Sequence, residues 1–267
     1  MLELGLGAQE ALSVPGTGAV IGAYGKAAYL RVPGGLFALT GPEVVSGPIH
    51  ARTDRADMRR LRVGDRVVVT ATLLEAGPVL LDLGAATVWR GHLPAVAPTS
   101  ADLDVEGLAA RLGGAGPGLT PAGDDFLAGV LLVARLSWGE SAEERLVRVA
   151  RTVPTNDVAR AFLVWAARGQ CVEPVHRFLL GRSAGALAAV RRLGHTSGAA
   201  LADGLLYALQ AFATPVQWGG AGWGPLEPAG GPAWQRSSLP VRPSSALADL
   251  PLGRLPITTG WCGPPPT

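Results

Sequence analysis

The stretch from Gly113 to Asp125 has residue types and spacing suited to binding a small charged ligand. It reads Gly-Gly-Ala-Gly-Pro-Gly-Leu-Thr-Pro-Ala-Gly-Asp-Asp, and four of its first six residues are glycine. Glycine lets the backbone adopt positive φ angles and approach a ligand closely. A helix is predicted to follow, with Thr120 as N-cap and Pro121 in its first turn, so unpaired N–H groups and the helix dipole favour an anion. The expected ligand-binding residues here are Gly116, Gly118, Thr120 and Gly123.

Asp124 and Asp125 lie just inside this helix start and would repel a bare phosphate. They indicate a metal ion, a bound ammonium or amide group, or capping of their own helix. Neighbouring residues on a helix diverge by about 100°, so the two carboxylates cannot hold one ion from regular geometry. We therefore expect one aspartate to serve a ligand and the other to serve the loop.

Gly194-His195-Thr196-Ser197-Gly198 is a second glycine-flanked stretch that introduces a predicted helix. The side chains of His195, Thr196 and Ser197, together with Gly198, could bind a carboxylate or phosphate, and the two helix starts could face a common cleft. The structural alternatives are a His195 ring bonded to a neighbouring carbonyl, a Ser197 that is a plain N-cap, and glycines that only permit close packing.

Several other site classes do not fit the sequence. The first glycine stretch lacks the Lys-Ser/Thr of a nucleotide-binding P-loop and does not follow a strand in the dinucleotide-binding pattern. His50, His92 and His176 have no ligand spacing, and Cys171 and Cys262 are too far apart for a zinc site or a disulfide framework. No metal site and no cofactor are therefore predicted, with Mg²⁺ left open as a companion of the ligand.

The composition is that of a globular protein. The 267 residues are 48% hydrophobic and 16% charged, with a net charge of +2 spread along the chain, which excludes a concentrated basic stripe for nucleic acid. No stretch reaches the ~20 apolar residues of a membrane helix, and the first residues show no signal-peptide pattern. We expect a cytoplasmic protein that binds neither nucleic acid nor membrane.

The predicted elements indicate an α+β protein. Short apolar runs between glycine and proline turns predict strands over 19–24, 28–32, 36–40, 66–71 and 79–83, a short helix at 55–61, and hence a small antiparallel β-barrel or sandwich. A helical period then predicts a bundle with helices over 102–112, 120–138, 141–151, 156–168, 173–180, 183–193 and 199–213. A capping box at Ser141–Glu144 opens the third of these helices, Thr155 or Asn156 caps the fourth, and Gly169 ends it.

Three regions follow from this order of elements. Residues 1–98 form a β-rich domain that ends in a linker containing Pro94 and Pro98, and residues 99–215 form a helical domain with both glycine stretches. Residues 216–267 are rich in proline, glycine and tryptophan and predict an extended or disordered tail.

The stretch from Gly116 to Leu127 resembles the signature of the AllH family, formerly a family of unknown function, and Gly194–Gly198 resembles its second motif. The resemblance covers the second half of the chain and leaves out the tail; Ala122 stands where it leads us to expect serine. The family's named member is a subunit of oxamate carbamoyltransferase, which acts with two other subunits. That enzyme interconverts carbamoyl phosphate and oxamate with oxalurate and phosphate in allantoin catabolism.

The resemblance implies what the motif residues do. The glycine loop would bind the phosphate or carboxylate, Asp124 or Asp125 would orient the amide or accept a proton, and His195 would act as acid/base or ligand donor. The Ser-Thr-Arg-Thr motif of ordinary carbamoyltransferases is missing, so such catalysis would use a different site. The competing hypothesis is a non-catalytic subunit that binds a small ligand for regulation or assembly.

Overall fold

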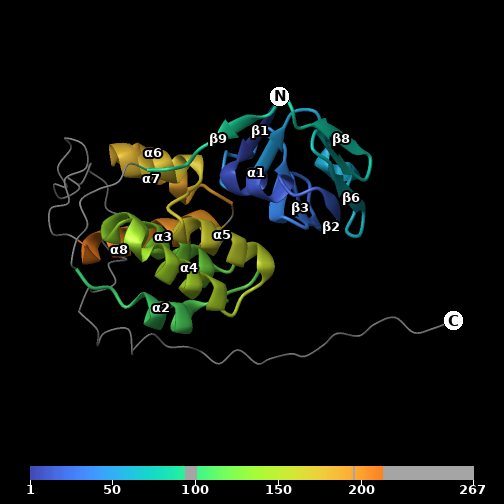
Figure 1. Ribbon diagram of the computed structural model, residues 1–267. Coiled ribbons are helices and arrows are strands. Elements are labelled where there is room, and N and C mark those ends of the chain that lie inside the picture. Colours follow the sequence, from blue (N-terminus) through green and yellow to red (C-terminus); the bar gives the residue numbers. More distant parts are fainter. Residues whose placement is uncertain (94–100, 195, 213–267) are drawn as a thin grey trace. The chain divides into compact units, whose positions relative to one another are not determined.

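The computed structural model describes residues 1–93, 101–194 and 196–212, which all belong to one compact unit, Met1–Glu227. These residues form an α+β fold with a strand-rich first part and a helical second part, as the sequence predicts (Figure 1). The predicted linker prolines, Pro94 and Pro98, and the predicted tail over 216–267 lie outside the described residues.

The strands of the described residues form one curled, nine-stranded sheet in the order β8-β7-β6-β2-β3-β4-β5-β1-β9 (Figure 1). Helix α1, Leu6–Leu12, packs against β1, β4 and β5, and its Ala8, Ala11 and Leu12 join the buried core of the sheet. The strands are β1 Leu2–Gly5, β2 Gly16–Ala23, β3 Ala27–Val32, β4 Gly35–Thr40, β5 His50–Thr53, β6 Arg66–Val69, β7 Leu73–Ala76, β8 Val79–Asp82 and β9 Thr87–Trp89.

All five predicted strands are present, as β2, β3, β4, β6 and β8, but the sheet is mixed rather than purely antiparallel. Two pairs, β4 with β5 and β1 with β9, run parallel. The sequence analysis missed β1, β5, β7, β9 and α1 because these elements have three to seven residues and no long alternating or helical pattern. The short helix expected at 55–61 is a 3₁₀ turn over Met58–Arg60.

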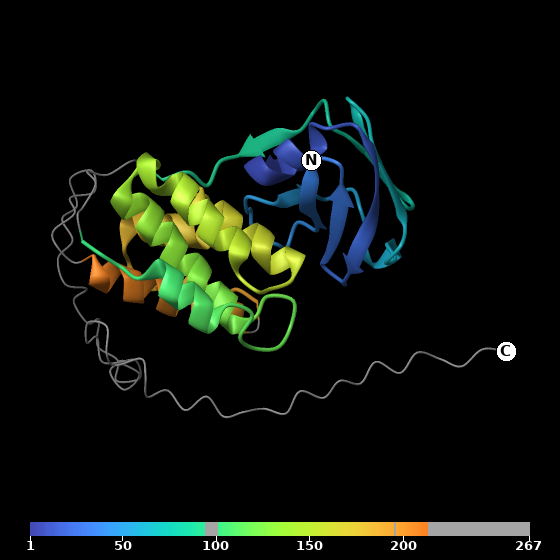
Figure 2. The ribbon, with the colours of Figure 1, turned by 60° about the horizontal axis from the view of Figure 1, so that its bottom comes forward.

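The helical part is built around α3, which packs along α8 and α5 (Figure 2). Its apolar residues from Leu127 to Leu136 are almost all buried, which makes α3 the core helix of the bundle. The helices are α2 Val105–Leu112, α3 Ala122–Trp138, α4 Glu143–Thr152, α5 Asp157–Ala167, α6 Glu173–Gly181, α7 Ala184–Arg191 and α8 Ser197–Ala211.

Two of the predicted helix caps are wrong and one is confirmed. Helix α4 follows a 3₁₀ turn, and its N-cap, Ala142, makes no side-chain bond, so the expected capping box does not form. The N-cap of α3 is Pro121, and the Thr120 hydroxyl lies 2.9 Å from the Ser197 hydroxyl instead of capping the helix. Asn156 caps α5 by accepting bonds from the amides of Val158 and Ala159.

A hydrogen bond, an aromatic contact and an ion pair join the two parts within this unit. The Glu173 amide donates to the Ser46 carbonyl at 2.9 Å, the His50 ring meets the Phe162 ring edge to face, and Arg31 forms an ion pair with Asp157. The start of α5 therefore lies against β3. Within the ranges that the structure describes, no helix has the length and apolar character to span a membrane.

Candidate functional site

The glycine-rich loop adopts the backbone conformation that its sequence predicts. Gly114, Gly116 and Gly118 have φ angles of +69°, +114° and +98°, which side-chain-bearing residues rarely adopt. A Cβ on Gly118 would meet no atom, so this glycine is required by conformation and borders open space. Among the described residues, the amides of Gly116, Gly118 and Thr120 donate no backbone hydrogen bond.

Two other predicted ligand-binding glycines are explained by packing. A Cβ on Gly123 would lie 2.0 Å from the Leu112 carbonyl oxygen, and the Gly123 amide already donates to the Ala115 carbonyl at 2.8 Å. A Cβ on Gly198 would lie 2.3 Å from the Val190 carbonyl oxygen. Gly123 thus lets the start of α3 approach the end of α2, and Gly198 lets the start of α8 approach the end of α7. Both contacts agree with the alternative that these glycines permit close packing.

Asp124 holds the glycine loop in place. Its side chain is buried, with 2% exposed, and one carboxylate oxygen accepts a 2.8 Å bond from the Gly114 amide. The other oxygen accepts a bond from the Thr155 hydroxyl, in the turn before α5. Since both oxygens are occupied, Asp124 is the aspartate that serves the loop.

Asp125 has the free carboxylate oxygen. Its Oδ2 is buried and, within the described residues, has no hydrogen-bond partner. Burial raises the pKa of the carboxyl to about 7; hydrogen bonds from Ser197 and Thr120 oppose this shift, and the charge of Asp124 adds to it. A carboxyl group with this pKa exchanges protons readily near neutral pH, as a general acid or base requires.

The two glycine-flanked stretches meet at this carboxyl group. The Thr120 and Ser197 hydroxyl oxygens lie 2.9 Å apart, although 77 positions separate them in the chain. Ser197 is the first residue of α8, and Thr196 is its exposed N-cap, whose side chain makes no capping bond. His195, the third predicted catalytic residue, lies outside the described residues.

Tyr29 on β3 is a neighbour of this site that the sequence analysis missed. Burial, the adjacent Tyr24 and the charge of Asp125 raise the pKa of its phenol to about 12. The Tyr24 and Tyr29 rings pack edge to face, with 6.1 Å between their centroids. A tyrosine in an alternating strand gives no local signal of chemistry, because its partner is about 100 positions away in the chain.

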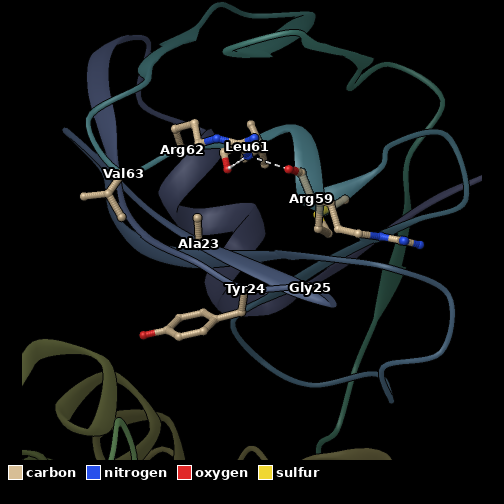
Figure 3. A pocket seen from close by; sticks show the side chains of 8 residues that line it. Ala23, Tyr24, Gly25, Arg59, Leu61, Arg62 and Val63 are labelled. Atoms are coloured by element: carbon tan, nitrogen blue, oxygen red, sulfur yellow. Dashed lines mark hydrogen bonds between the residues drawn. The ribbon is translucent and has the colours of Figure 1, made fainter.

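Two cavities lie elsewhere in the described residues. One, of about 370 Å³, lies between Tyr24 and the segment Met58–Val63 (Figure 3). The Arg62 guanidinium there donates hydrogen bonds to the Arg59 and Leu61 carbonyl oxygens. The other, of about 400 Å³, is lined by Glu3, Arg52, Trp89 and Glu173, among others. No group of three His, Cys, Asp or Glu side chains in the described ranges is placed to hold a metal ion.

Comparison with known proteins gives one match. Residues 112–209, which span the glycine loop, both aspartates and most of α8, match a family described as "Oxamate carbamoyltransferase subunit AllH". No curated protein and no solved structure matches the chain. Over residues 112–209, the chain is therefore similar to the AllH family.

Proposed function

We propose that this chain is a subunit of an oxamate carbamoyltransferase-type enzyme and binds a small anionic substrate at the junction of the glycine loop, Asp125 and the start of α8. The observation that carries the proposal is the Asp125 carboxyl group. It has a buried oxygen without a partner, a pKa of about 7, and two hydroxyl groups beside it. The family description supports both the reaction class and the need for other subunits.

The proposed reaction joins carbamoyl phosphate and oxamate. The amide nitrogen of oxamate attacks the carbamoyl carbon, the carbon–oxygen bond to phosphate breaks, and oxalurate and phosphate form. Asp125 accepts the proton that the nitrogen loses and returns it to the departing phosphate, so its carboxylate is restored. A pKa of about 7 suits both transfers, because the group is divided between its two forms at neutral pH.

The glycine loop supplies the binding groups in this mechanism. The amides of Gly116, Gly118 and Thr120 would hold the phosphate or carboxylate and stabilise charge that develops on the carbonyl oxygen. Asp124 acts as a positioning residue, since its bonds to Gly114 and Thr155 fix the loop. Thr196, the N-cap of α8, stays a predicted ligand donor. His195 stays a predicted ligand donor and a predicted acid or base.

The alternative is a subunit that binds the ligand for regulation or assembly and leaves the chemistry to its partners. The packing roles of Gly123 and Gly198 favour it, because they explain part of the motif without a substrate. Under either proposal we expect partner subunits and, as the resemblance implies, a role in allantoin nitrogen catabolism in the cytoplasm.

A thermal-shift experiment on the purified full chain tests the proposal. Ligands that bind only the folded state raise the melting temperature. We expect carbamoyl phosphate, oxamate or oxalurate, with or without Mg²⁺, to stabilise the wild type and to lose this effect in Asp125→Asn. Asp203→Asn is the matched control, since Asp203 lies on α8 in an exposed ion pair with Arg191. Equal shifts in wild type and Asp125→Asn would refute the assigned site.

If the shift survives in Asp125→Asn, the ligand binds elsewhere on the chain. If ligand binding is lost and the assembled complex still turns over with Asp125→Asn, the regulatory alternative holds instead. Loss of both binding and turnover supports the catalytic role.

A further inference from the structure

β3 and the glycine loop both contact the start of α5, so β3 offers a further set of side chains on this side of the helical part. Ala28, Leu30 and Val32 are buried in the core of the sheet. Because side chains alternate along a strand, Tyr29 and Arg31 lie together on the opposite face. This face of β3 is the one that meets the helical part.

Arg31 shows where that face lies. Its guanidinium forms an ion pair with Asp157, the first residue of α5. The preceding residue, Asn156, donates its side-chain amide to the Leu119 carbonyl of the glycine loop at 2.9 Å. One helix start therefore contacts both the face of β3 that carries Tyr29 and the glycine loop.

The properties of the phenol agree with this placement. Burial is the main reason that the pKa of Tyr29 rises to about 12, and the charges of Tyr24 and Asp125 add to the effect. The phenol therefore keeps its proton at neutral pH and is a hydrogen-bond donor. A partly buried phenol donor, together with a carboxyl group that has an unpaired oxygen, suits a ligand that offers both an acceptor oxygen and an amide N–H, as oxamate does.

We propose that Tyr29 belongs to the ligand site and that its phenol donates a hydrogen bond to a carboxylate or carbonyl oxygen of the ligand bound at Asp125, Thr120 and Ser197. The inference rests on the proposed function and extends it, because it assigns the β-rich part a share in binding a small amide carboxylate. Tyr29 lies outside the residues that match the family.

Isothermal titration of the full chain with oxamate tests this inference. Tyr29→Phe removes the hydroxyl and keeps the ring, so we expect it to fold and to bind oxamate about 10- to 100-fold more weakly, the usual loss for a bond to a charged group. Tyr207→Phe is the matched control. Tyr207 lies ten residues beyond Ser197 on α8 and packs on Phe126, with 5.5 Å between the ring centroids. We expect this variant to bind like the wild type.

The outcomes separate the two proposals. If Asp125→Asn loses binding while Tyr29→Phe binds like the wild type, the inference about Tyr29 is wrong and the proposed function stands. Equal losses in Tyr29→Phe and Tyr207→Phe also overturn it, because the effect is then not local. If the wild type binds oxamate and neither Asp125→Asn nor Tyr29→Phe weakens it, both proposals are wrong. A wild type that does not bind oxamate overturns the inference about Tyr29, and the proposed function is then decided by the thermal shifts with carbamoyl phosphate and oxalurate.

Discussion

At the scale of single residues, the adjacent Asp124 and Asp125 have different hydrogen-bonding environments. Asp124 points into the protein and has both oxygens occupied by Gly114 and Thr155. Asp125, about 100° further round the helix, reaches Thr120 and Ser197 and keeps one buried oxygen unpaired. Such an unpaired polar group lowers stability, and proteins retain this kind of group where it serves a function.

The raised pKa of Asp125 predicts a pH-dependent gain in stability for Asp125→Asn. The carboxyl group titrates at 3.8 ordinarily and at about 7 in the folded protein, so folding favours its protonated form. The protonated carboxyl group contributes its full stabilisation below pH 3.8, and this contribution is lost as the pH rises through about 7. Asparagine does not titrate. At pH 8 we therefore expect the free energy of unfolding of Asp125→Asn to exceed that of the wild type by about 1–3 kcal/mol, a value lowered to allow for the partial exposure of the carboxyl group.

Urea unfolding at pH 4 and pH 8 measures this gain. The difference between variant and wild type should be small at pH 4 and large at pH 8. A difference that does not depend on pH would contradict the assigned titration, and a less stable variant at pH 8 would mean that the carboxylate has a partner there.

At the scale of elements, the site depends on the close approach of α3 and α8, which carry Asp125 and Ser197. Two glycines permit it: a Cβ on Gly129 would lie 2.6 Å from the Leu201 carbonyl oxygen, and a Cβ on Gly204 would lie 2.0 Å from the Phe126 carbonyl oxygen. Backbone atoms cannot move aside as a flexible side chain can. The two helices would therefore have to separate if either glycine gained a side chain.

Gly204→Ala is expected to destabilise the protein by about 2 kcal/mol or more, because the new methyl group overlaps the backbone of α3. Gly185→Ala is the matched control in α7, where a Cβ meets no atom. There alanine should stabilise the helix by roughly 0.5–1 kcal/mol. Thermal unfolding of both variants tests this expectation. Equal melting temperatures for Gly204→Ala and Gly185→Ala would show that the contact between α3 and α8 can accommodate a methyl group.

At the scale of the whole described unit, His50 links the sheet to the helices. Its imidazole Nδ1 donates to the Val45 carbonyl at 2.8 Å, and its ring packs edge to face with Phe162 of α5. Burial lowers the pKa of this histidine, while the Val45 bond and the charge of Glu3 oppose the shift. The folded protein therefore holds His50 in its neutral form.

This burial predicts a weakness toward acid that His50→Asn should reduce. As the pH falls below 6.5, the unfolded chain protonates the histidine while the folded protein does not, so stability falls toward the lower folded pKa. Asparagine keeps a donor for Val45 and does not titrate. We expect stability to fall less between pH 7 and pH 5 in His50→Asn than in the wild type, as measured by urea unfolding. His92→Asn, at an exposed histidine, serves as control; parallel profiles for His50→Asn and the wild type would contradict the assignment.

Features that depend on neighbouring residues could be predicted from the sequence. The glycines of the loop predicted positive φ angles, and Gly114, Gly116 and Gly118 adopt them. Alternation and helical periodicity placed the longer strands and the helices of an α+β fold, because both patterns reflect which side of one element faces the core. The argument that adjacent aspartates diverge also held, since it needs only helix geometry.

Features that join residues far apart in the chain became visible only in the folded protein. Folding paired β1 with β9 and β4 with β5 in parallel, brought Thr120 to Ser197, and turned Asp125 rather than Asp124 toward them. It also brought Tyr29 within range of the Asp125 charge and left no room for a Cβ at position 204. None of these has a local signal, because burial, carboxyl pKa and the room for a Cβ are set by atoms that folding brings from other parts of the chain.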